Sequence, residues 1–106
     1  NNIDFIDKYD GIFCQQDYCT LGIIKGLNEK NIKIPDKISI LGHDDFEEII
    51  NMFSPRLSTI KQPFEELCLN AISYLMGEIK NENVSVKRSL KAAIIERESW
   101  EEGELC

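Results

Sequence analysis

Short apolar runs and one helical apolar stripe organise the first half of the chain. The runs at 10–15 and 38–42 are too short for helices and are flanked by glycine or polar residues, so we expect buried strands there. Between them, residues 18–30 carry apolar side chains at helical spacing, with Asp17 before them as a plausible N-cap. A strand, a helix and a strand within about 30 residues predict a βαβ unit with a right-handed crossover and a parallel sheet.

The middle of the chain predicts a short helix and then a third extended segment. The pattern at residues 46–53 predicts a short helix, which Ser54 and Pro55 would end. Residues 57–62 alternate between apolar and polar positions. That alternation is typical of a strand, although an extended linker has the same pattern.

The longest apolar stripe follows, at residues 63–79, where apolar side chains recur at steps of three and four. Pro63 suits the first turn of this helix, because a proline there lacks no helical hydrogen bond. The stretch 84–100 is rich in strand-forming residues, and we expect residues 92–95 to be buried. The acidic end of the chain is expected to be frayed.

Charge and hydropathy limit the partners of this segment. With 106 residues, the chain is long enough for one modest domain, and 42% hydrophobic with 29% charged residues is ordinary for a globular protein. A net charge of −7 opposes direct contact with nucleic acid. It does not exclude a DNA-binding domain elsewhere in a longer protein. No apolar run approaches the roughly 20 residues of a membrane helix.

The cysteines predict neither a metal site nor a disulfide framework. The chain has one histidine and no CxxC pair, so the ligand spacing of a zinc site is missing. We expect reduced, mostly buried thiols in a cytoplasmic protein, and no cofactor. The chain opens without methionine or signal peptide, which suggests a fragment of something larger. The four cysteines are Cys14, Cys19, Cys68 and Cys106.

The motifs of common enzymes are missing from the sequence. It has no GxSxG, no P-loop and no GxGxxG. His43 stands next to Asp44, but neighbours on an extended chain point in opposite directions, so the two do not form a catalytic dyad. We therefore expect a protein that is not an enzyme. A small α/β hydrolase or phosphoryl-transfer domain using these two residues is kept as a distant alternative.

Polar side chains follow each of the three predicted strands. In open parallel sheets, ligands bind outside the carboxyl ends of the strands. Carboxylates accept two hydrogen bonds, and amides both donate and accept, so such side chains suit a sugar or another polyol better than a phosphate. The residues at the three strand ends are Gln15, Gln16 and Asp17, then His43, Asp44 and Asp45, then Lys61 and Gln62.

Each of these side chains also has a purely structural interpretation. Asp17 suits the role of a helix cap better than that of a ligand, and Asp45 would cap the helix at 46–53. Gln62 would be a linker residue before a proline, and His43 a half-buried substitute for an aromatic ring. The shared location at strand ends nevertheless favours a functional role for Gln16 and Asp44.

Several motifs resemble the lactose/galactose-repressor (LacI/GalR) family of bacterial transcription regulators. They are "IPDKISILGHDD" at 34–45, "PRLSTIKQPFEELC" at 55–68 and "RES" at 97–99, and the resemblance runs from about 10 to 100. It implies an α/β fold with a parallel βαβ sheet of the periplasmic-binding-protein-like type I, present here as an incomplete piece of a two-lobed effector domain. Residues 1–106 would be its C-terminal portion.

The resemblance also implies how the chain divides between the two lobes. Residues 10–57 would belong to the C-terminal lobe, 58–80 to a lobe crossing and a helix of the N-terminal lobe, and 86–100 to the returning strand. The DNA-binding helix-turn-helix domain would lie outside this sequence. The helix at 63–79 would then need another surface for its apolar face, for instance a second copy of the chain.

The resemblance also implies roles for individual residues, according to their positions in the family's motifs. Gln16 stands where the family has a ligand-contacting asparagine, and Asp44 stands at the aspartate that binds effector hydroxyls. His43 replaces a more usual aromatic ring, Gln62 matches a hinge glutamine near the ligand, and Asp17 matches the aspartate of the family's "ND" pair, which we interpret as a cap. The resemblance places the dimer interface at Leu21, Gly22, Ile24, Ile50, Met52 and Phe53.

The expected function is effector sensing and homodimerisation in a cytoplasmic, sugar-responsive DNA-binding regulator. The partners implied are a small sugar or sugar-like effector, a second copy of the chain, and DNA only through the helix-turn-helix domain; no membrane partner is expected. The alternative is a sugar-binding protein of a transport system, which shares the fold.

Overall fold

The structure, a computed structural model, describes residues 6–52, 54–82 and 89–101. The chain divides into two compact units. The first unit comprises Asn1–Lys61 with Ala93–Cys106, and the second comprises Gln62–Ala92.

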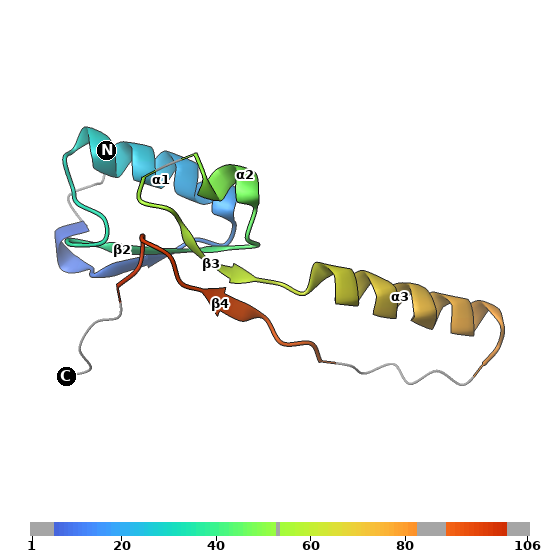
Figure 1. Cartoon of the computed structure of the whole chain (residues 1–106). Coiled ribbons are helices and arrows are strands. Elements are labelled where there is room, and N and C mark those ends of the chain that lie inside the picture. The colour runs from blue at the N-terminus through green and yellow to red at the C-terminus, as the bar shows by residue number, and fades with distance from the viewer. Residues whose placement is uncertain (1–5, 53, 83–88, 102–106) are drawn as a thin grey trace. The chain divides into compact units, whose positions relative to one another are not determined.

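A four-stranded mixed sheet forms the first unit (Figure 1). Its strands are β1 (Gly11–Phe13), β2 (Ser39–His43), β3 (Ser58–Lys61) and β4 (Ala93–Ile95), in that spatial order. The first three strands are parallel, and β4 runs antiparallel to β3. The predicted α/β class with a parallel βαβ sheet is therefore confirmed.

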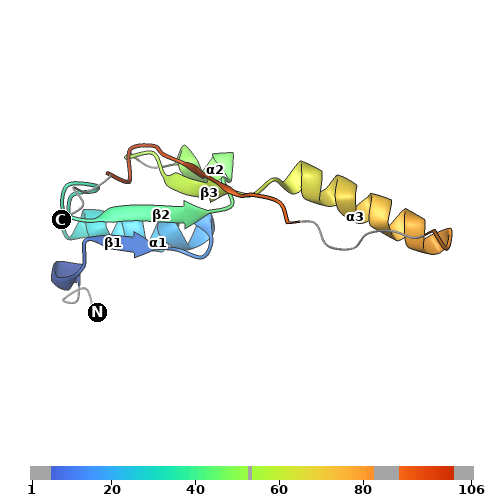
Figure 2. The ribbon, with the colours of Figure 1, turned by 90° about the horizontal axis from the view of Figure 1, so that it is seen from below.

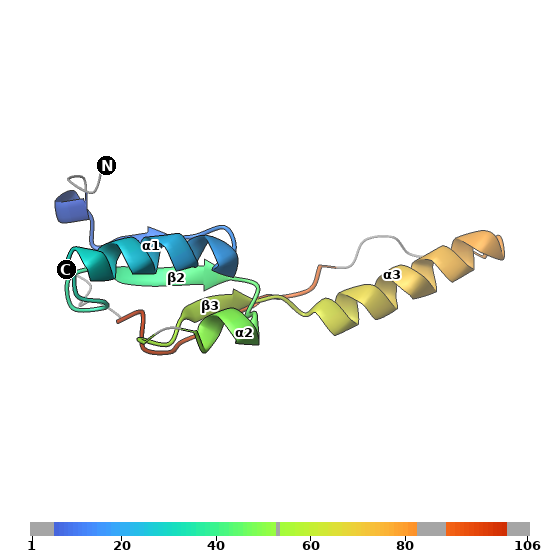
Figure 3. The ribbon, with the colours of Figure 1, turned by 90° about the horizontal axis from the view of Figure 1, so that it is seen from above.

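Helices α1 (Asp17–Glu29) and α2 (Glu47–Ile50) lie over one face of the sheet (Figures 1 and 3). Their apolar sides and the inward side chains of β2 enclose the core, because burial of these branched side chains is the main gain on folding. The core consists of Cys14, Ile24, Leu27, Ile38, Ile40, Ile49, Ile50 and Leu57.

The other face of the sheet is open in the part of the chain that the structure describes, and this corrects two predictions. The run at 10–15 was expected to be a buried strand, but Phe13 in β1 is 61% exposed. Residues 92–95 were also expected to be buried, but Ile94 in β4 is 54% exposed. Uniformly apolar strands are typical of sheets covered on both faces, and here the described helices cover only one.

Helix α3 (Phe64–Ile79) is the regular element among the described residues of the second unit. It begins one residue later than predicted, because Pro63 is its N-cap. The predicted wide apolar face is present and largely exposed, and Gly77 is the buried residue of the helix. The exposed apolar side chains are Phe64, Leu67, Leu69, Ile72, Leu75, Met76 and Ile79.

Both predicted aspartate caps are wrong. The N-cap of α1 is Gln16 and that of α2 is Phe46, and neither helix has a side-chain cap hydrogen bond. Asp17 is instead the first residue of α1.

The burial predicted for the thiols holds only for Cys14, since Cys19 and Cys68 are exposed. Cys106 lies outside the described residues. Within the described part of the chain, no helix combines the length and hydropathy that a membrane span requires.

Candidate functional site

The carboxyl ends of β1 and β2 lie at one edge of the sheet, because the two strands run side by side in the same direction (Figure 2). His43 is the last residue of β2, and Asp44 follows it. The backbone N–H of Asp44 donates to the carbonyl of Ile60 in β3 at 2.8 Å, which fixes this point beside the next strand. Gln16 follows β1 and is exposed in an extended conformation.

His43 and Asp44 form a polar pair at this edge. The distance between His43 Nδ1 and Asp44 Oδ1 is 2.9 Å, and the two side chains are 28% and 12% exposed. Phe13 meets the His43 ring edge-on, with ring centroids 6.5 Å apart. An apolar ring therefore stands beside a carboxylate and an imidazole, and the largely exposed face of Phe13 is available to an apolar surface of a ligand. The sequence does not single out Phe13, because this residue has the pattern of one more apolar position in a buried run.

Asp17 is fully buried and supports the site from inside the unit. Its Oδ2 accepts a hydrogen bond from the N–H of Phe46 at 2.8 Å, and its Oδ1 accepts one from the hydroxyl of Thr59 at 2.7 Å. Both carboxylate oxygens are therefore engaged within the protein. The side chain joins α1, the turn after β2, and β3.

The turn at Asp44 and Asp45 has an unusual backbone. Both residues have positive φ angles, 111° and 61° respectively. Side chains with a Cβ rarely adopt such angles, and a φ of 111° lies beyond the left-handed helical region. Three successive N–H groups anchor the turn: Asp44 donates to Ile60, Asp45 donates to the Thr59 hydroxyl at 3.3 Å, and Phe46 donates to Asp17.

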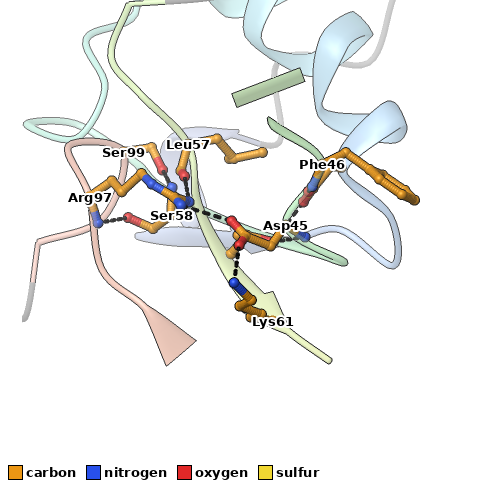
Figure 4. A network of polar contacts seen from close by, with 9 residues as sticks. Asp45, Phe46, Leu57, Ser58, Lys61, Arg97 and Ser99 are labelled. Carbon is orange, nitrogen blue, oxygen red and sulfur yellow. Dashed lines mark hydrogen bonds and ion pairs between the residues drawn. The ribbon is translucent and has the colours of Figure 1, made fainter. Parts of the chain in front are cut away.

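The Asp45 side chain is held by two cations (Figure 4). Arg97 Nη2 donates to Asp45 Oδ1 at 2.8 Å, and Lys61 Nζ lies 3.6 Å from Asp45 Oδ2. Arg97 Nη1 also donates to the carbonyl of Leu57 at 3.0 Å, and its backbone N–H donates to the Ser58 hydroxyl at 2.7 Å. Asp45 is thus an internal anchor rather than a helix cap.

Arg97 stands out in the sequence only as part of the "RES" motif, which does not predict its contact with Asp45. The residue is 52 positions from Asp45 in the chain, and no local pattern connects the two.

Gln62 follows β3 and is half-buried. It belongs to the second unit, whereas Gln16, His43 and Asp44 belong to the first. Gln16, His43 and Asp44 are therefore the candidate site residues that lie within one unit.

The dimer residues implied by the family resemblance fall into two groups. Gly22 and Met52 are exposed and Leu21 is half-buried, so these three reach the surface. Ile24 and Ile50 are 1% and 2% exposed and belong to the core. Ile24 and Ile50 are therefore removed from the interface candidates, because side chains buried inside one unit cannot contact a second copy. Phe53 lies outside the described residues.

A separate apolar groove of about 190 Å³ lies against α1. It is lined by Ile6, Gly22, Ile23, Gly26 and Leu27. These side chains offer no hydrogen-bonding groups, so the groove does not suit a hydroxyl-rich ligand. Across residues 6–52, 54–82 and 89–101, no three side chains of His, Cys, Asp or Glu gather closely enough to hold a metal ion.

The fold and the polar residues at the strand ends define an α/β domain with a candidate ligand site at the carboxyl ends of parallel strands, and comparison with known proteins makes this class specific. Residues 4–100 match the periplasmic binding protein-like domain family, and the chain belongs to that family. Its relatives are LacI-type regulators, so the predicted membership of the lactose/galactose-repressor group is confirmed.

Two curated relatives are transcriptional repressors. The HTH-type transcriptional repressor PurR of Vibrio atlanticus is 36% identical over 81 residues, which cover 76% of this chain and 24% of that protein. The ribose operon repressor of Haemophilus influenzae is 39% identical over 72 residues, which cover 68% and 21%. The chain therefore spans less than a quarter of the length of these relatives.

One solved structure adds a bound ligand. The periplasmic binding protein/LacI transcriptional regulator from Alkaliphilus metalliredigens, complexed with D-xylulofuranose, is 32% identical. The match covers 93% of this chain and 37% of that one, with a TM-score of 0.81. The names of these relatives favour a transcription regulator over a sugar-transport protein. None of the three names is that of an enzyme.

Proposed function

We propose that the chain is the effector-binding and dimerisation segment of a cytoplasmic, sugar-responsive bacterial repressor. The observation that carries this proposal is the placement of Gln16 and the His43–Asp44 pair at one edge of the sheet, after neighbouring parallel strands. DNA contact would be made by the helix-turn-helix domain that the family joins N-terminally to its effector domain. Catalysis and a cofactor are not part of the proposal.

The proposed effector is a sugar of pentose size. The Asp44 carboxylate would accept hydrogen bonds from vicinal hydroxyls, and Gln16 would donate and accept. Phe13, which is 61% exposed, would cover the apolar side of the sugar ring. The regulator complexed with D-xylulofuranose supports this size class, and the relative named a ribose operon repressor agrees with a pentose-linked role.

His43 and Gln62 complete the proposed set of effector contacts. His43 would orient the Asp44 carboxylate through their 2.9 Å contact and would itself lie beside the ligand. Gln62, which follows β3, is the fourth residue that we propose as an effector contact. Asp17 would act indirectly, since its oxygens are engaged inside the protein.

Effector binding would act on DNA affinity through two lobes and a dimer. Residues 10–57 and 86–100 would belong to one lobe, and 58–80 to a crossing and a helix of the other. The exposed apolar face of α3 supports this division, because such a face needs a partner. The effector would favour one lobe arrangement, with the coupling free energy of about 1–3 kcal/mol that is typical of allostery.

Calorimetric titration of the full-length protein with D-ribose and D-xylulose tests the proposal. Asp44→Ala should weaken binding by about 10- to 100-fold, because hydrogen bonds to a charged group contribute about 1.5–3 kcal/mol each. Asp36→Ala, which removes an exposed aspartate between α1 and β2, is the matched control. Equal affinities of the two variants would contradict the assignment of Asp44.

The alternative functions are separated by what the full-length protein does with DNA and with the sugar. A repressor should retain a DNA fragment from its own promoter in a gel-shift assay and change that retention when the sugar is added. A transport protein would bind sugar and not DNA. Chemical conversion of the sugar that disappears in His43→Ala would indicate an enzyme instead.

A further inference from the structure

We propose that Arg97 is a positioning residue for Asp44, acting through Asp45, and that it sets how tightly the effector is bound. The inference rests on the proposed function in one respect, since it takes Asp44 as an effector ligand. The contact between Arg97 and Asp45, which positions the turn, does not depend on which ligand binds.

The turn at Asp44 and Asp45 has a sparsely populated backbone conformation. Asp44 and Asp45 are consecutive non-glycine residues with φ angles of 111° and 61°. A sparsely populated backbone conformation persists only where the surrounding structure over-determines it. The conformation in which Asp44 presents its carboxylate to His43 therefore depends on contacts made by the rest of the turn.

Arg97 supplies the main contact that holds the Asp45 side chain in the turn. Main-chain donors of residues 44–46 are all satisfied, but they fix the amides and not the side-chain direction of Asp45. The Asp45 carboxylate is fixed by Arg97 at 2.8 Å, with the two side chains 12% and 18% exposed. Lys61 is 60% exposed and lies at 3.6 Å, so solvent screens it and Arg97 dominates.

Arg97 is itself fixed by several hydrogen bonds. Its guanidinium bridges Asp45 and the carbonyl of Leu57, and its N–H is bound to Ser58. Ser99 fixes the same segment to β2 and β3, since its hydroxyl donates to Ile40 and accepts from Ser58, both at 2.7 Å. A planar fork with several donors can make two such bonds at once, whereas a lysine ammonium lacks that geometry.

Loss of the guanidinium would leave the nearly buried Asp45 carboxylate with the solvent-exposed Lys61 ammonium, 3.6 Å away, as its remaining cation partner among the described residues. The turn would then relax from its strained φ angles, because one of the contacts that impose them is gone. Asp44 is the adjacent residue on the same turn, so its carboxylate would move away from His43. The effector would lose affinity although its own contact residues are unchanged.

Calorimetry on the full-length protein with D-ribose and D-xylulose measures the effect on affinity. Arg97→Met should weaken binding by about 2- to 30-fold, the range of coupling seen for residues that act from outside a ligand site. Arg97→Lys should fall between Arg97→Met and the wild type. Arg56→Met, which removes an exposed arginine just before β3, is the control and should bind as the wild type does.

A double-mutant cycle shows whether Arg97 acts through Asp45. Asp45→Asn should weaken binding about as much as Arg97→Met, and the double variant should be no weaker than either, because both remove the same interaction. Additive losses would mean that Arg97 acts by another route, and would overturn the inference.

A ligand-free signature separates positioning from a merely structural role. The ¹⁵N resonance of His43 Nδ1, assigned with His43→Asn, reports the 2.9 Å contact with Asp44. It should shift in Arg97→Met and in Asp45→Asn but not in Arg56→Met. A folded Arg97 variant with lower stability, an unchanged His43 resonance and wild-type affinity would overturn the inference.

The two proposals fail in different ways. If the wild type binds neither sugar while the His43 resonance still shifts in the variants, the sugar assignment is wrong and the positioning role stands. If the wild type binds sugar and Arg97 and Asp45 variants bind equally well, the positioning role is wrong. If Arg97→Met does not fold, the milder variants Arg97→Lys and Asp45→Asn replace it. Their sugar affinity and their His43 resonance are then judged in the same way.

Discussion

Asp17 Oδ2 accepts a hydrogen bond from the backbone N–H of Phe46 at 2.8 Å, across 29 positions of the chain. The bond joins the first residue of α1 to the N-cap of α2. Because the carboxylate is fully buried and its other oxygen accepts from β3, one side chain connects three elements around the turn at Asp44. The same feature makes the unit sensitive to small changes at this point.

Asp17→Ala should lower the free energy of unfolding by about 2–4 kcal/mol, because it leaves one buried and one partly buried donor without their acceptor. The donors are the N–H of Phe46 and the hydroxyl of Thr59. Urea unfolding measures the change, and Asp36→Ala provides the control at an exposed aspartate. A loss no larger than that of the control would contradict the structural role given to Asp17.

Gly42→Ala should destabilise the same region by steric overlap. A Cβ at this position would lie 2.3 Å from Asp17 Oδ1 and 3.0 Å from Leu57 Cδ2, both in the buried interior. Overpacking of this kind costs about 1–3 kcal/mol, and here it also displaces the Asp17 carboxylate. Gly11→Ala is the matched control, because its Cβ would meet only Ser39 O at an ordinary 3.7 Å. Thermal unfolding that gives equal midpoints for both variants would argue against the packing described.

Cys14 should make stability fall at alkaline pH. Burial, with smaller contributions from nearby Cys19 and Asp17, raises the pKa of the Cys14 thiol from 9.0 to about 11. Below pH 9 the thiol is protonated in both the folded and the unfolded chain, so its stabilisation is fully present. Between pH 9 and 11 only the unfolded chain ionises, and about 2–3 kcal/mol is lost as pH rises through the folded pKa.

Urea unfolding from pH 8 to 11.5 checks the Cys14 prediction. Other groups titrate in this range, so the slope of the unfolding free energy against pH is compared between variants. Cys14→Ala should reduce the slope, whereas Cys19→Ala, at an exposed thiol, should largely retain it. The same slope in Cys14→Ala as in the wild type would refute the assignment.

Met52→Glu should weaken self-association of the full-length protein if the proposed dimer interface is correct. Met52 is 61% exposed, and a charge desolvated at an interface weakens association by about tenfold or more. Ile94→Glu changes a comparably exposed side chain on β4, outside the proposed interface, and should leave the dimer intact. Sedimentation equilibrium distinguishes the two variants. Dimers of equal strength would exclude Met52 from the interface.

The sequence predicted well where one physical signal was sufficient. The apolar run of β2 ends in consecutive polar residues, and the structure places that end at a sheet edge. The apolar stripe at 18–30 correctly indicated helix α1, in which Leu27 belongs to the core. Both features follow from local periodicity and from the topology that a βαβ unit imposes.

Predictions failed where the result depended on distant residues. Asp17 precedes an apolar stripe just as a helix cap does, but Thr59 and Phe46 offer it two buried donors, and those bonds determine its position. Asp45 likewise turns toward Arg97, which is remote in sequence. Phe13 has the composition of a buried strand residue, and its exposure depends on which faces of the sheet are covered.

The pairing of β3 with β4 has a consequence for how this domain can vary. Lys61 and Ala93 are register partners in that antiparallel pair, and the whole second unit is inserted between them. The chain leaves and re-enters the first unit at adjacent points, so the inserted segment can change in length or content without altering the order of the strands. An insertion attached in this way can diverge separately from the sheet that carries Asp44.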